Sequence, residues 1–308
     1  TQEKLDLQRD VVRNERRQSS EDTPYGVAWL EMPKMLFPAD HPYGHSVIGT
    51  HEDLQAATVE DVVGFFNQWY VPNNAGLVVA GNFDPEEVKS LIDRYFGSLA
   101  PVDLPARTPP EQPDLPVQPL VELTDQVQVA KTHLLWHTPA ALTPGDAAMD
   151  VLASLLSSGR SSRLYRKLLV EAALVQEISA YQMSQQYGSI FLVEGLPTEG
   201  HTVEELEAAV AAELRLLATA GPTEDELQRV KNQLSVGFLQ SLESLQSRAS
   251  ALNRYRVLAG EPDWVDEDIA RYDAITVDDV RHAAAHLNPG RRGILRVRPA
   301  PNPDGGEN

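Results

Sequence analysis

The stretch TVEDVVGFFNQWYVPNNAGLVVAG, residues 58–81, decides the fold because the chain contains it twice. Its second version, TVDDVRHAAAHLNPGRRGILRVRP, occupies residues 276–299. Each version predicts a helix with a threonine N-cap, then a proline, a short polar turn and an apolar strand. The offset between the two stretches is 276 − 58 = 218 residues.

The same offset aligns a second pair of segments. VRNE at 12–15 pairs with VKNQ at 230–233. Two separate matches in one register indicate a duplicated domain, which we describe as a first copy and a second copy. The second copy begins near Leu120, so the first should begin near 120 − 218 = −98, and we expect about a hundred residues to precede Thr1.

A proline-rich segment separates the two copies. PVDLPARTPPEQPDLPVQP, residues 101–119, carries seven prolines, which neither a helix nor a central strand would tolerate, so it is predicted to be an extended linker. The predicted organisation is therefore a C-terminal part of a first domain over 1–100, a linker over 101–119, a second homologous domain over 120–300 and a disordered tail over 301–308.

Local patterns predict mixed helices and strands on both sides of the linker. Strict alternation of strand and helix is missing, which favours an α+β fold: two homologous α/β domains, each a mostly antiparallel sheet layered with helices. The predicted strands cover 75–81, 128–139, a pair within 175–195, and 292–299. The predicted helices cover 2–18, 58–70, 85–97, 145–156, 161–172, 202–219, 223–246, 248–259 and 276–287.

Composition excludes several classes of function. The 308 residues carry a formal net charge of −19, which argues against nucleic acid or an anionic membrane surface as partner. The chain has no cysteine, so disulfides and thiolate metal sites are excluded. No apolar run approaches the roughly 20 residues that span a bilayer, so no membrane span is expected.

Glu15 is the candidate functional residue of the opening helix. At 100° per residue, Gln8 and Glu15 lie within about 20° of each other, and Val11 and Val12 flank the same face. In the second copy the position of Glu15 is occupied by Gln233. A residue that only keeps the fold should tolerate either side chain, whereas a metal ligand should not. The alternative is a surface helix whose glutamate pairs loosely with neighbouring arginines.

Several stretches together resemble the insulinase and pitrilysin family of zinc peptidases, and are closest to bacterial members that resemble mitochondrial processing peptidase. They are LDLQRDVVRNERRQ (5–18), PYG (24–26), HPYGHSVIGT (41–50), FFNQWYVPNNAGLVVAGNFDPEEV (65–88), YFG (95–97), SSGRSSRLYRKL (157–168), PTEDELQRVKNQL (222–234) and ITVDDV (275–280). The resemblance covers essentially the whole chain. It implies the insulinase-like fold, with residues 1–100 forming the C-terminal part of the zinc-binding peptidase domain.

The resemblance also implies the chemistry. Family members bind Zn²⁺ with an inverted His-x-x-Glu-His motif, and a second glutamate 70 to 80 residues later completes the site. Glu15 stands at that later position, so it is the expected metal ligand of this chain. The motif itself does not occur in the 308 residues and by family spacing would lie roughly 60 residues before Thr1. No catalytic residue is therefore expected in this chain, and we expect the chain alone to lack zinc and to be inactive.

Expectations about partners follow from the same resemblance. The full-length protein would cleave unfolded peptides inside a chamber closed by a second family half or subunit, as a homodimer or heterodimer. Family members often supply an Arg and a Tyr seven residues apart to grip the substrate, where this chain has Leu169 and Gln176. Gln8 replaces a usual glutamate, which puts support of the metal ligand in doubt at that point. The alternative function is a non-catalytic structural or assembly subunit. An exported bacterial location is favoured over the cytoplasm.

Histidine pairs elsewhere are weaker candidates. His282 and His286 have the spacing of a zinc site, but no glutamate lies between them, and the repeat gives their helix a structural counterpart. His133 and His137 share one face of a predicted strand, for which a surface or sheet-edge role is the simpler interpretation.

Overall fold

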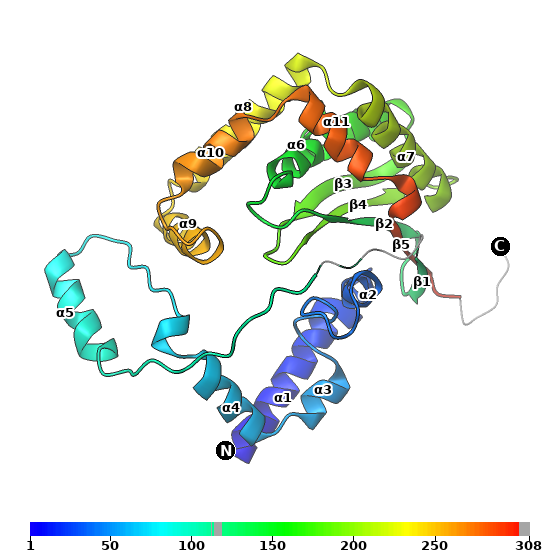
Figure 1. Ribbon diagram of the computed structural model, residues 1–308. Helices are drawn as coiled ribbons and strands as arrows, with labels where there is room; N and C mark the ends of the chain where they lie inside the picture. Colours follow the sequence, from blue (N-terminus) through cyan, green and yellow to red (C-terminus); the bar gives the residue numbers. More distant parts are fainter. Residues whose placement is uncertain (112, 114–118, 302–308) are drawn as a thin grey trace. The chain divides into compact units, whose positions relative to one another are not determined.

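The computed structural model describes residues 1–111, 113 and 119–301, which form two compact units (Figure 1). Unit 1 comprises residues 1–13, 50–109 and 234–269, and the other described residues make up unit 2. Residues 112 and 114–118 of the predicted linker, and the predicted tail beyond residue 301, lie outside the described residues. The division of the chain at 101–119 stays a prediction.

Unit 2 is built on one five-stranded sheet with the strand order β1-β5-β2-β4-β3. β1 runs parallel to β5, and the other neighbours are antiparallel, which confirms the predicted α+β fold with a mostly antiparallel sheet. The strands are β1 (Leu120–Asp125), β2 (Lys131–Thr138), β3 (Val175–Met183), β4 (Ser189–Pro197) and β5 (Gly293–Pro299).

Helices cover both faces of this sheet (Figure 1). One face carries α6 (Asp146–Ser157), α7 (Val203–Ala220) and α11 (Val277–His286). The other face carries α2 (Val27–Leu36), whose Met32 and Leu36 pack with Leu135 and Leu295 of the sheet. Gly293 permits this approach, since a Cβ there would lie 2.8 Å from the Met35 side chain. The sequence did not predict α2 or β1, nor the helices at residues 51–56 and 265–273.

Unit 1 contains helices but no strand among its described residues. Its elements are α3 (His51–Ala56), α4 (Val59–Trp69), α5 (Pro85–Phe96) and α9 (Leu245–Leu258), together with most of α1 (Gln2–Arg16) and parts of α8 (Glu224–Ser241) and α10 (Val265–Asp273). Thr58 and Thr276 close matching capping boxes with Asp61 and Asp279, as the repeat predicts. No helix in the described part of the chain is long and apolar enough to cross a bilayer.

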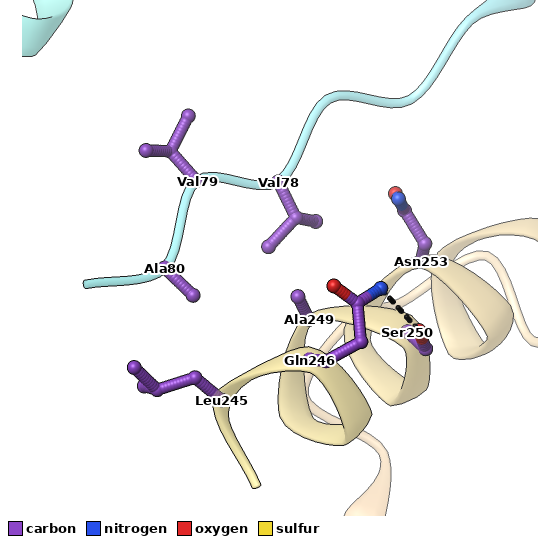
Figure 2. Close-up of a pocket in the computed structure, with 8 residues that line it drawn as sticks. All are labelled: Val78, Val79, Ala80, Leu245, Gln246, Ala249, Ser250 and Asn253. Atoms are coloured by element: carbon purple, nitrogen blue, oxygen red, sulfur yellow. Dashed lines mark hydrogen bonds between the residues drawn. The ribbon is translucent and has the colours of Figure 1, made fainter.

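The prediction of a strand over 75–81 is wrong. Residues 75–80 have no regular secondary structure, although Ala75 has extended backbone angles. A strand needs a neighbour that accepts its backbone hydrogen bonds, and the described residues of unit 1 offer none. Val78, Val79 and Ala80 instead line an open groove of about 430 Å³ opposite α9 (Figure 2).

Comparison with β5, its counterpart in the second copy, shows that the segment 75–80 is not packed against neighbouring strands. Leu77 corresponds to Leu295 of β5 (77 + 218 = 295), yet Leu77 is 57% exposed and Leu295 is fully buried. The apolar face of α4 differs from that of α11 in the same way: Phe66 is exposed and its counterpart Ala284 is buried. The same sequence block therefore forms a packed strand only where β1 and β2 flank it.

This difference predicts unequal effects of two matched substitutions. Leu295→Ala should lower the free energy of unfolding by about 2–5 kcal/mol, because it removes buried side-chain atoms from a packed core. Leu77→Ala should change it by less than about 1 kcal/mol, since Leu77 is exposed. Urea unfolding of the two variants measures both changes. Equal losses of unfolding free energy would contradict the conclusion that Leu295 is packed in a core and Leu77 is not.

Candidate functional site

Glu15 lies in the last turn of α1 with its side chain exposed. In the described part of the chain its carboxylate makes no hydrogen bond or ion pair. The neighbouring arginines bind other groups: Arg16 donates to Glu21 at 2.7 Å and Arg13 lies 3.4 Å from His51. An exposed carboxylate can act as a zinc ligand, and the role of Glu15 stays a prediction.

Glu15 has no further ligands within the structure. Among the described residues, no group of three or more His, Cys, Asp or Glu side chains could hold a metal ion. A zinc site at Glu15 would therefore need ligands from outside these residues.

In the second copy, the residue at the position of Glu15 contacts the end of another helix. Gln233, the counterpart of Glu15, donates from Nε2 to Oγ of Ser158 at 2.7 Å. Ser158 directly follows α6, and 233 − 158 = 75 residues separate the two side chains. With the repeat offset, Ser158 corresponds to position 158 − 218 = −60. This is where the family resemblance expects the His-x-x-Glu-His helix.

Two of the candidate histidines, His133 and His286, contact protein groups that account for their positions. The predicted surface or sheet-edge position of His133 is wrong, because β2 is the middle strand of the sheet and His133 is 1% exposed. Its Nε2 lies 3.2 Å from Oε2 of Glu194 on β4. Nε2 of His286 lies 2.9 Å from the carbonyl oxygen of His137, which explains this side chain without a metal. Sequence alone could not pair His133 with Glu194, because the contact requires the strand register.

Glu194 carries an altered pKa in this cluster. Burial alone would raise the pKa of this carboxyl, but the hydrogen bond from His133 and the charge of Lys131 lower it to about 2. Lys131 Nζ lies 3.3 Å from the carboxylate. The ionised form is therefore stabilised by folding.

This pKa predicts an acid-dependent loss of stability. The unfolded chain binds a proton at Glu194 near pH 4.5 and the folded chain near pH 2, so the stabilisation is present above pH 4.5 and is lost as the pH falls to 2. The contribution is at most about 3 kcal/mol, because solvent screens a carboxyl that stays partly exposed. Urea unfolding between pH 5 and pH 2 should show a shallower decline for Glu194→Gln than for the wild type. If the free energy of unfolding falls equally with pH in both proteins, the pKa of Glu194 is not lowered by folding.

Glu15 itself should be neutral for folding. Because its carboxylate is exposed and unpaired, Glu15→Gln should change the free energy of unfolding of this chain by no more than about 0.5 kcal/mol. Thermal unfolding of the two chains checks this. A clear destabilisation would show that Glu15 is a structural residue.

Comparisons with known proteins match this architecture. The family model described as "Peptidase M16 inactive domain" matches residues 56–234. The zinc protease PqqE of Helicobacter pylori is 28% identical over 253 residues, which cover 81% of this chain and 57% of that protein. An uncharacterized zinc protease of Mycobacterium leprae is 27% identical over 300 residues, covering 96% of this chain and 66% of the relative. The chain thus spans about three fifths to two thirds of the length of these relatives.

Solved structures show the same fold. The crystal structure of a protease from Helicobacter pylori superposes with a TM-score of 0.88 at 24% identity, covering 97% of this chain and 73% of that one. An inactive peptidase M16 domain from Pseudomonas fluorescens superposes with a TM-score of 0.85 at 17% identity, covering 98% of this chain and 71% of that one.

Proposed function

Because the chain belongs to the insulinase (peptidase M16) family, we propose that it is part of a zinc-dependent endopeptidase in which Glu15 is a metal ligand. The other ligands would come from a His-x-x-Glu-His helix that precedes Thr1 in the full-length protein. When bound, zinc in such a site supplies an activated water for hydrolysis of a peptide bond.

The contact between Gln233 and Ser158 carries this proposal. It supports an arrangement in which the last turn of the Glu15 helix meets the end of a helix 75 residues earlier in the chain. The second copy keeps this contact with an amide and a hydroxyl, which bind zinc poorly. The first copy has a carboxylate at the equivalent position, where a ligand is needed.

The rest of the chain would serve as a scaffold. We propose that the second domain pairs with a second family half or subunit to enclose unfolded peptides. Gln176 donates from Nε2 to the carbonyl of Pro197, so this side chain is already held by β4. The side chains that grip the substrate would therefore come from the partner.

Zinc content of the full-length protein tests the role of Glu15. Glu15→Gln should lower bound zinc from about one ion per chain to a small fraction, because one anionic ligand is lost. The matched variant Gln233→Glu should keep zinc at the wild-type level. Metal analysis by mass spectrometry after dialysis gives both values, and a Glu15→Gln protein that retains its zinc would overturn the proposal.

The second candidate is a non-catalytic subunit of the same family. The matching family model is described as an inactive domain, and a domain without catalytic residues is compatible with both candidates. The coding sequence upstream of Thr1 discriminates between the two. An intact His-x-x-Glu-His about 75 residues before Glu15 favours the peptidase, and a broken motif favours the subunit.

A further inference from the structure

A π-helical turn follows Glu15 almost directly. The α-helix α1 ends at Arg16, and the π turn η1 (Arg17–Glu21) continues it. The N–H of Asp22 donates to the Arg17 carbonyl oxygen at 2.7 Å, five residues back along the chain. π turns are rare in helices and are frequent at functional sites. The position of this turn next to Glu15 therefore suggests a role in function.

The side chain of Arg16 binds both the π turn and a neighbouring loop. Its Nε donates to Oε1 of Glu21 at 2.7 Å, and its Nη1 donates to the carbonyl oxygen of Gly49. The Arg16 side chain is 12% exposed, so water screens these bonds only weakly. Residues five apart point about 140° away from each other on an α-helix, so the π turn is what brings Arg16 and Glu21 together.

Other contacts hold the same turn. A Cβ at Gly26 would lie 2.2 Å from the carbonyl oxygen of Ser20, so only glycine permits this approach. Thr23 Oγ1 donates to the carbonyl oxygen of Gln18 at 2.7 Å. The residues that follow Glu15 thus form an ordered turn with its own partners, in contrast to a helix end that frays.

The second copy has neither this turn nor this ion pair. The offset of 218 residues places Leu234 at the position of Arg16 and Leu239 at the position of Glu21. Both leucines lie within α8, which is α-helical throughout. The register holds through this segment, because the next helices of the two copies, α2 and α9, begin at equivalent positions (27 + 218 = 245).

The ion pair and the carboxylate occur in the same copy. The first copy combines Glu15 with Arg16 and Glu21, whereas the second copy has an amide and two leucines at these positions. A pair needed only for the fold should occur in both copies, since both keep the threonine-capped helices. The Arg16–Glu21 pair is therefore linked to the feature that distinguishes the first copy, which is the carboxylate of Glu15.

We propose that Arg16 is a positioning residue for Glu15. This inference rests on the proposed role of Glu15 as a zinc ligand. Glu15 lies in the last α-helical turn, and helix ends fray unless other groups hold them. Arg16 joins this turn to Glu21 and to Gly49, so it keeps the Glu15 carboxylate in one place. A ligand that is already in place binds a metal more tightly, because less conformational entropy is lost on binding.

The zinc affinity of full-length variants tests this role. Arg16→Leu introduces the second-copy residue and should raise the Kd for zinc about 10- to 100-fold. One zinc per chain should still bind at saturation, because the ligands remain, and this separates Arg16 from Glu15. The matched control is Arg17→Leu, which removes the same charge from an exposed neighbour and should change the Kd less than about threefold. Competition with a chromophoric zinc chelator measures these constants.

A double variant tests whether Arg16 acts together with Glu21. Glu21→Gln removes the charge and nearly keeps the size of the side chain. It should raise the Kd for zinc less than Arg16→Leu does, because Arg16 keeps its bond to the Gly49 carbonyl. The double variant should have the Kd of Arg16→Leu within about threefold. A Kd raised by the product of the two single factors would contradict the proposed joint action.

Hydrogen exchange of the metal-free full-length protein tests the turn itself. Arg16→Leu should speed amide exchange in residues 17–22 by about tenfold or more, and Arg17→Leu should leave it unchanged. Equal exchange in the wild type and Arg16→Leu would overturn the inference. So would an unchanged zinc Kd for Arg16→Leu, while the proposed function would stand. A wild type that binds no zinc would overturn the proposed function and this inference with it.

Discussion

The hydrogen-bond ladder that holds β5 between β1 and β2 is the interaction on which unit 2 depends. It joins a strand near the end of the chain to two strands that follow the linker, with one parallel and one antiparallel neighbour. The same sequence block without such neighbours, at 75–80, forms no strand. Backbone pairing rather than local propensity therefore decides whether this block becomes part of a sheet.

Because the domain is duplicated, each residue of one copy can be compared with its counterpart in the other copy. Where both copies keep an apolar residue or a capping box, the position supports the fold. Where they differ in charge, the difference indicates a separate role. Glu15 against Gln233 is such a difference, because a carboxylate replaces an amide at this position.

The local elements with strong signals were predictable from sequence. Threonine caps located α4 and α11, and short runs rich in apolar residues located β2 and β5. The helix α2 was missed because Pro33 lies inside it, close to its C-terminal end, where a proline normally argues against a helix.

The candidate site was predictable only in part. Family spacing and the repeat predict Glu15 as a metal ligand, since both depend on positions along the chain, and this role stays a prediction. The burial of His133 was missed because polar side chains usually lie at the surface, and its partner Glu194 comes from another strand. The contact of Gln233 with Ser158 was missed as well, although the repeat and the family spacing place both residues at meaningful positions.

Anomalous diffraction at the zinc edge from crystals of the full-length protein tests whether Glu15 is a zinc ligand. We expect one strong peak about 2.0–2.2 Å from a carboxylate oxygen of Glu15, with two histidine nitrogens completing the protein ligands. A zinc peak elsewhere in the molecule, or no peak from a protein grown with zinc, would contradict it.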